Sequence, residues 1–188
     1  MEEDKFYHIF NRGNNRENIF KEEDNYYYFL KQYEKYLSNA VDTYAYCLMP
    51  NHFHLLVRIR ENKTSSVFKA PQVSKLLTPA EKAFRDFFIS YAKSINKKYD
   101  RVGSLFQYKF KRKEINDEMY LKRLVMYIHQ NPVVAGFCDS VSEWKFSSYK
   151  SLLSALPTKL KREEVISWFN EKENFKYCHN TEVELDEY

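Results

Sequence analysis

The stretch CLMPNHFHLLVRI, from Cys47 to Ile59, places two histidines one residue apart in a segment that otherwise reads as a buried β-strand. Alternate side chains of a strand face opposite sides of the sheet. One side carries the expected core residues Phe53, Leu55, Val57 and Ile59. His52 and His54 both fall on the other side, about 6.6 Å apart along the backbone, so both imidazoles can reach one ion. The stretch therefore predicts a strand that packs through one face and carries half of a metal site on the other.

The histidine pair also has a simpler interpretation, in which each ring lies on a partly exposed strand and bonds to water or to a neighbour. The spacing alone supports the two interpretations equally, because isolated histidine pairs are frequent. A metal site needs a third ligand, and no HExxH motif or Cys/His cluster supplies one. The candidates are therefore the polar residues of the helix expected later in the chain.

The first 60 residues predict four elements of secondary structure. Residues 41–50 and 52–60 read as two strands that meet at Pro50-Asn51, a pair that suits a tight hairpin turn. The segment from Phe6 to Gly13 has strand-like composition and ends at a glycine. Between them, helical spacing links Tyr26, Leu30, Tyr33 and Leu37. The expected order is strand, helix, strand, strand.

A second helix and a fourth strand are expected after a loop over residues 61–77. Thr78 is a predicted N-cap, Pro79 suits the first helical position and Glu81 completes a capping box. The apolar stripe of this helix is Phe84, Phe88, Tyr91 and Ile95, and the helix is expected to run toward Tyr99. The segment Phe106 to Lys113 alternates aromatic and basic residues, which predicts a strand with one basic side.

Another helix is expected from Asn116, its predicted cap, to Pro132, its predicted end. Its core face would consist of Leu121, Leu124, Val125 and Ile128. The remainder is less regular, with a short helix expected around Glu163 to Phe169. We expect residues 1–153 to form the main domain, and residues 154–188 to form an extension that is first helical and then an acidic tail.

Composition limits the class of protein. The 188 residues include 44% hydrophobic and 18% aromatic residues, enough for one core. No long apolar run and no secretory signal appears, so we expect a soluble intracellular protein. The three cysteines are far apart, which fits neither a disulfide framework nor a cysteine zinc site. Residues 93–113 contain eight lysines and arginines against one acid, which indicates a polyanionic partner.

Five blocks of sequence resemble one known family in the family's own order. They are NRGNNRENIF, AYCLMPNHFHLLV, GSLFQYKF, YIHQNPVVAG and WKFSSYKS, which together span from about Tyr7 to Leu153. The chain resembles the single-tyrosine HUH transposases, whose name describes a His-hydrophobic-His motif, here His52-Phe53-His54. It is most similar to the branch associated with repetitive extragenic palindromes in bacteria.

This resemblance implies a fold and a site. The implied fold is α+β: a ferredoxin-like antiparallel sheet with helices packed on one face, as in HUH nucleases, plus a C-terminal helical extension. Tyr127 matches the family's nucleophile, and Asn131 matches the residue that completes a metal site with His52 and His54. Residues four apart share one helix face, which agrees with this pairing. The implied cofactor is a divalent metal, Mg²⁺ or Mn²⁺, although imidazoles intrinsically favour zinc or nickel.

The resemblance also implies a substrate and a reaction. The substrate would be single-stranded DNA with a hairpin, cleaved by tyrosine attack to give a 5′-phosphotyrosine and a 3′-hydroxyl. Residues expected to contact this DNA are Arg12, Asn14, Arg16, Lys109, Lys111, Lys113 and Arg123. The expected location is the bacterial cytoplasm, at the nucleoid. Monomer and homodimer are both compatible with the sequence.

Two other functions remain open from the sequence. The same architecture serves site-specific nicking enzymes of single-stranded DNA, such as replication initiators and relaxases. A domesticated protein could keep the fold as a nucleic-acid-binding module without catalysis. The matched set of His52, His54, Tyr127 and Asn131 argues against the second alternative.

Overall fold

The computed structural model describes residues 1–61, 77–107, 109–181 and 183. The expected loop after residue 61 and most of the acidic tail lie outside these residues, as does Tyr108. Within the described ranges, no helix has the length and apolar character needed to cross a membrane.

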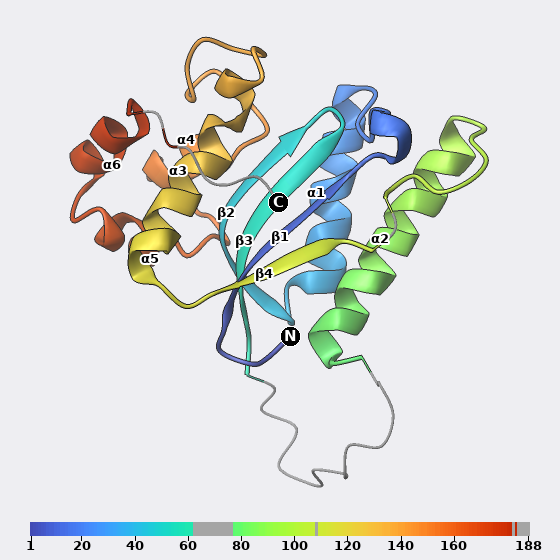
Figure 1. The fold of residues 1–188 in the computed structure, drawn as a ribbon, viewed down its shortest axis with the longest axis horizontal. Helices are drawn as coiled ribbons and strands as arrows, with labels where there is room; N and C mark the ends of the chain where they lie inside the picture. The colour runs from blue at the N-terminus through green and yellow to red at the C-terminus, as the bar shows by residue number, and fades with distance from the viewer. Residues whose placement is uncertain (62–76, 108, 182, 184–188) are drawn as a thin grey trace, which may run out of the picture.

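A four-stranded sheet forms the centre of the molecule (Figure 1). Its strands are β1 (Phe6–Arg12), β2 (Val41–Met49), β3 (His52–Ile59) and β4 (Lys111–Ile115), in the order β2-β3-β1-β4. All neighbouring strands are antiparallel. With α1 (Glu23–Leu37) after β1 and α2 (Pro79–Lys98) after β3, the chain follows the β-α-β-β-α-β order of ferredoxin-like folds. The predicted fold class is therefore confirmed.

One face of the sheet packs against α1 and α2. The odd-numbered side chains of β3, from Phe53 to Ile59, all belong to this first core, as the alternation predicts. Phe29 from α1 and Phe87 from α2 meet edge to face, with ring centroids 4.9 Å apart. The helices that complete the ferredoxin-like unit thus share one side of the sheet, as expected.

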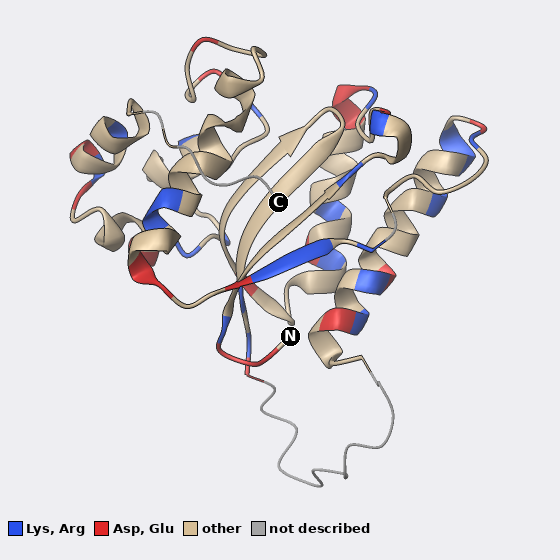
Figure 2. Ribbon diagram, in the orientation of Figure 1, with Lys and Arg blue, Asp and Glu red and all other residues tan. Residues whose placement is uncertain are grey.

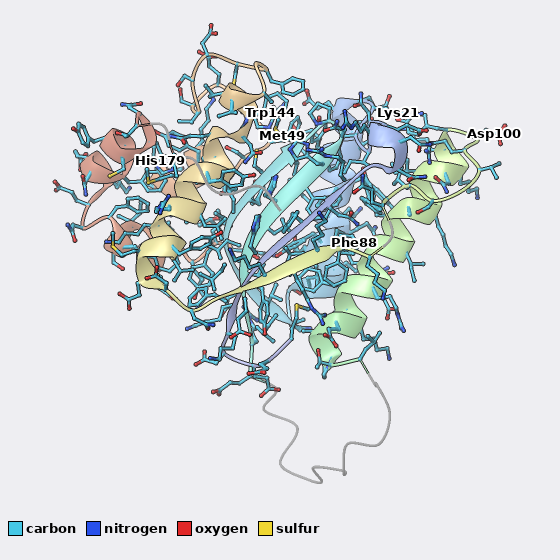
Figure 3. All side chains as sticks on the ribbon, viewed as in Figure 1. Lys21, Met49, Phe88, Asp100, Trp144 and His179 are labelled. Atoms are coloured by element: carbon cyan, nitrogen blue, oxygen red, sulfur yellow. The ribbon has the colours of Figure 1, made fainter. Side chains whose placement is uncertain are left out.

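The opposite face is also covered by helices, which the expectation of helices on one face did not include. These helices are α3 (Glu118–Val134), α4 (Tyr149–Leu153), α5 (Arg162–Trp168) and α6 (Lys172–His179). A second core forms here because this face is apolar too, with Leu56 on β3 and Ala45 and Cys47 on β2 fully buried. Figure 3 shows Phe88 with α2 on one side of the sheet and His179 with α6 on the other.

The start of α2 agrees with the sequence. Thr78 is the N-cap, Pro79 begins the helix, and the capping box with Glu81 is complete in both directions. The Glu81 carboxylate also contacts the N-terminal ammonium at 2.9 Å and forms an ion pair with Arg112. The N-terminus, α2 and β4 are thereby connected around one side chain.

The limits of α3 differ from the prediction. Its N-cap is Asp117 and not Asn116, since the Asp117 side chain accepts a hydrogen bond from the backbone N–H of Met119 at 3.0 Å. Pro132 does not end the helix, which continues to Val134. Pro132 has no N–H to donate to the Ile128 carbonyl, so one hydrogen bond of the helix is missing. The next turn is intact, because the Ala135 N–H donates to the Asn131 carbonyl at 3.0 Å. Asn131 therefore remains on the same helix as Tyr127.

The predicted strand from Phe106 to Lys113 is wrong in its first half. β4 begins only at Lys111, and Phe106 makes a single isolated bridge to Gly13. Phe106 and Phe110 pack against Phe88 of α2, with ring centroids 5.5 and 5.3 Å away. Phe106 is buried and Phe110 is half-buried against the first core, so both rings already pack on protein side chains and not on nucleic-acid bases.

Candidate functional site

The two histidines lie on β3, which is an inner strand of the sheet. Antiparallel pairing places Phe10 of β1 opposite His54 and Arg12 opposite His52. His54 is only 7% exposed, because α3 covers this face, whereas His52 is half-buried. The interpretation of two rings on a partly exposed strand is therefore wrong for His54, which is a buried polar residue that needs a partner.

Each imidazole is held through its Nδ1 atom. His54 Nδ1 lies 2.9 Å from Nε2 of His8, a buried residue of β1. His52 Nδ1 lies 2.6 Å from Oδ1 of Asn51 in the hairpin turn. Burial lowers the pKa of His54 well below its usual value, so the ring is neutral near pH 7. Neutral imidazoles engaged at Nδ1 can use Nε2 to ligate a metal.

The helix α3 brings Tyr127 and Asn131 over the histidines. The Tyr127 ring meets the His54 ring edge to face, with centroids 5.5 Å apart and planes at 85°. One turn later, Asn131 Nδ2 donates a hydrogen bond to the Tyr127 carbonyl at 2.8 Å. This bond uses the amide nitrogen of Asn131 and leaves the side-chain oxygen, Oδ1, as the atom that can ligate a cation.

These four residues line one pocket of about 350 Å³. Its floor is the sheet, with His8 and Phe10 beside the histidine pair, and one wall is α3. The volume suits a nucleotide-sized group. The structure thus brings together Tyr127, His52, His54 and Asn131, which the resemblance to the HUH transposases assigns to one site.

The donor set fits a divalent cation. Two imidazoles bound through Nε2 to one ion have ring centroids at most about 6.5 Å apart, given metal–nitrogen bonds of about 2.1 Å. The centroids of His52 and His54 are 5.3 Å apart. Among the described residues, no group of three or more His, Cys, Asp or Glu side chains could hold a metal. Any third protein ligand would therefore be of another type, and an amide oxygen such as that of Asn131 suits Mg²⁺ or Mn²⁺.

Basic residues lie along the rim of the pocket. In Figure 2, β4 is blue over most of its length. Lys111 and Lys113 lie opposite Phe10 and His8, so both side chains share the face of the histidines. Lys111 lines the pocket, as does the exposed Arg12. Lys113 contacts the wall of the pocket, because its Nζ lies 3.2 Å from the hydroxyl of Tyr120 on α3.

The other predicted DNA contacts lie outside the pocket. Asn14 and Arg16 form a short 3-10 turn, η1 (Asn14–Arg16), after β1. Lys109 is exposed just before β4, with a φ of 60°. Arg123 is exposed on α3. None of these four residues lines the pocket, so any contact that they make with DNA would lie outside it.

The sequence did not identify several residues of the pocket, among them His8, Phe10 and Tyr120. The alternation of FYHIFNR places His8, Phe10 and Arg12 on one face of β1, and that pattern is readable. Which face of β1 meets the histidine pair depends on the pairing of β1 with β3, which local patterns do not reveal.

Comparisons with known proteins place the chain in a family and match its fold. A curated protein of Haemophilus influenzae, described as a REP-associated tyrosine transposase, is 28% identical over 109 residues, which are 57% of this chain. The match spans 58% of that protein's length. A solved structure described as a REP-associated tyrosine transposase bound to a REP hairpin has the same fold, with a TM-score of 0.59 and 17% identity over 84% of each chain. The family model described as "Transposase IS200 like" matches residues 3–131, well over half of the chain, and the protein therefore belongs to the IS200-like transposase family.

Proposed function

We propose that this protein is a DNA strand transferase that cleaves single-stranded hairpin DNA with Tyr127 as the nucleophile. The observation that carries the proposal is the pocket in which Tyr127 of α3 stands over His54 of β3, with Asn131 one turn away. Membership in a transposase family supports an enzyme rather than a passive binding protein.

The proposed reaction is an exchange of phosphate esters. The Tyr127 hydroxyl attacks the phosphorus, the bond from phosphorus to the 3′ oxygen breaks, and the DNA's 5′ end remains attached to the enzyme as a phosphotyrosine. The phenol loses its proton to solvent, and the departing 3′ oxygen gains one. Because the phosphotyrosine retains the energy of the original ester, a second 3′-hydroxyl can reverse the step without ATP. This reversibility is what strand transfer requires.

His52, His54 and Asn131 would hold a divalent ion, Mg²⁺ or Mn²⁺. Such an ion, when bound, polarises the scissile phosphate and offsets the charge that builds up on its oxygens. None of these three side chains carries a negative charge, so the charge of such an ion would remain available to the phosphate oxygens. The burial of His54 keeps its ring neutral and able to ligate, since burial lowers its pKa.

The proposed substrate is hairpin DNA, by analogy with the relative whose structure contains a REP hairpin. The basic rim of the pocket supports a polyanion here, because Arg12 and Lys111 flank the catalytic face. The packing of Phe106 and Phe110 against Phe88 argues against recognition by stacking on that segment.

A covalent-adduct assay tests this function. The full chain is incubated with end-labelled hairpin DNA and Mn²⁺ or Mg²⁺, then separated under denaturing conditions. We expect a labelled protein band and a fragment with a free 3′-hydroxyl. On addition of a second strand with a 3′-hydroxyl, a joined product distinguishes strand transfer from simple nicking. The absence of an adduct with either ion would reject the proposal.

The contribution of the basic rim can be tested separately with Lys111→Ala. Lys111 is exposed at the pocket on the β4 edge of the sheet. We expect binding of the hairpin to weaken about 3- to 10-fold at low salt, and the slope of log affinity against log salt to fall by about 0.7, the value for one phosphate contact on a single strand. Fluorescence anisotropy at several salt concentrations measures both quantities. Lys82→Ala, on α2 at the other face of the sheet, is the matched control and should leave the slope unchanged. Equal effects of the two variants would contradict a DNA contact at Lys111.

A further inference from the structure

His8 is a buried histidine on β1 that contacts one of the proposed metal ligands directly. It is 4% exposed, and its Nε2 lies 2.9 Å from Nδ1 of His54. The two rings are nearly parallel, with centroids 5.1 Å apart and planes at 24°. Antiparallel pairing of β1 with β3 fixes this contact, because it places both side chains on one face of the sheet. The contact is therefore built into the fold.

We propose that His8 is a positioning residue that accepts the Nδ1 proton of His54 in the tautomer able to bind the metal, an inference that rests on the proposed metal site. A hydrogen bond between two ring nitrogens needs one donor and one acceptor, so the pair has two arrangements. In the first, His54 donates from Nδ1 and its Nε2 carries a lone pair toward the ion. In the second, His8 donates, the proton of His54 is on Nε2, and His54 cannot ligate. Only an acceptor at His8 Nε2 gives the competent form.

His52, the other proposed histidine ligand, is also held at Nδ1, but by a different partner. Nδ1 of His52 lies 2.6 Å from the side-chain oxygen of Asn51, and an amide oxygen can only accept. This contact fixes the proton of His52 on Nδ1 and makes Nε2 the basic nitrogen. Both metal ligands are therefore oriented through Nδ1, one by an amide and one by His8, as is usual for histidines that bind metals.

The hydrogen bonds of His8 involve only one of its two ring nitrogens. Its second nitrogen, Nδ1, has no hydrogen-bond partner among the residues that the structure describes. Among those residues the ring has one hydrogen bond, the one to His54, and when His8 Nε2 accepts, the proton of His8 lies on Nδ1. A side chain of similar size that cannot accept a hydrogen bond would keep the packing and remove only the control over His54.

Metal affinity in two variants tests the proposal. His8→Phe keeps a flat aromatic ring, slightly larger than imidazole, but offers no acceptor, while His8→Gln can place an amide oxygen near the position of Nε2. Mn²⁺ binding to the full chain is measured by electron paramagnetic resonance without DNA. We expect the dissociation constant to rise about 10- to 100-fold in His8→Phe, the range for loss of such an outer partner, and less than about 3-fold in His8→Gln. Equal weakening in both variants, or wild-type affinity in His8→Phe, would overturn the proposal.

A spectroscopic measurement on the metal-free chain distinguishes this inference from the metal site on which it rests. Nitrogen-15 NMR of the imidazoles reports which nitrogen of His54 carries the proton. We expect the proton on Nδ1 in His8→Gln and on Nε2 in His8→Phe, where Nδ1 would otherwise be a buried donor with no acceptor. The same tautomer in both variants would overturn the role of His8. If the wild-type protein binds no Mn²⁺, the proposed metal site is rejected. That outcome does not depend on the tautomer that NMR finds.

Discussion

The Tyr127→Phe variant should form no covalent adduct with hairpin DNA, while it still binds the DNA and the metal. The substitution removes only the hydroxyl that would attack the phosphate, and the ring can keep its edge-to-face contact with His54 at 5.5 Å. Loss of a covalent nucleophile leaves only the part of catalysis that comes from binding and electrostatics, so we expect adduct formation to fall by at least about 10³-fold. The labelled-adduct assay measures this rate, and anisotropy measures the retained binding.

Tyr120 provides the matched control for this result. It is a second tyrosine of α3 that lines the same pocket, and its hydroxyl lies 3.2 Å from Lys113 Nζ. Its neighbours differ from those of Tyr127, because Asn131 bonds to the Tyr127 carbonyl and the His54 ring faces Tyr127. The adduct should therefore still form in Tyr120→Phe. An adduct that persists in Tyr127→Phe and disappears in Tyr120→Phe would show that the nucleophile is Tyr120.

The sequence predicted the histidine strand well because the necessary pattern is local. Alternation along β3 placed Phe53 to Ile59 in one core and His52 and His54 on the other face, and both placements are confirmed. The same pattern did not reveal that this other face is buried. Its cover comes from α3 and from α4 to α6, three of which have only 5 to 8 residues. Helices that short show too little periodicity for a sequence to reveal the face they bury.

The fourth strand shows how a correct local pattern can mislead. Phe106 and Phe110 are spaced like one face of a strand, but both rings pack against Phe88 from an irregular segment between α2 and β4. Strand pairing stops at Lys111, which pairs with Phe10 near the end of β1. The contact between His8 and His54 could not be predicted from the sequence for a related reason. The contact depends on the register in which β1 pairs with β3, and only the folded sheet sets that register. The two histidines are 46 residues apart in the chain.

The second core contains another buried histidine pair, which joins the C-terminal helices to α3. His129 Nδ1 lies 2.8 Å from His179 Nε2, and His129 Nε2 lies 2.7 Å from the Ser148 hydroxyl. His179 Nδ1 donates to the Phe175 carbonyl at 2.7 Å, so its Nε2 must accept from His129. In the neutral pair, His129 Nε2 accepts from the Ser148 hydroxyl, and burial disfavours a proton on either ring because it lowers the pKa of both.

We expect the metal-free protein to lose stability steeply in mild acid, because four buried histidines resist protonation in the folded state. Burial lowers the pKa of His8 to about 3 and of His179 to about 4, and it lowers the pKa of His54 and His129 well below 6.5. The unfolded chain takes up these protons near pH 6.5 and the folded chain does not, so stability present above that pH is lost as the pH falls toward 4. Each histidine contributes about 1.4 kcal/mol per pH unit in that window. From pH 7.5 to 5.5 the loss is about 5 kcal/mol, comparable to the whole stability of many domains.

Urea unfolding at a series of pH values, with a chelator present, measures this loss, and His179→Gln isolates the share of one histidine. Glutamine does not titrate, and its amide oxygen can accept the hydrogen bond that His129 donates to Nε2 of His179. The variant should therefore unfold with a pH slope lower by about one proton, or about 1.4 kcal/mol per pH unit below pH 6.5. A wild-type stability that is flat between pH 7.5 and 5.5 would contradict the neutral state of these rings. An unchanged slope in His179→Gln would mean that the acid sensitivity arises from other groups. It would also mean that burial does not keep His179 unprotonated in the folded protein.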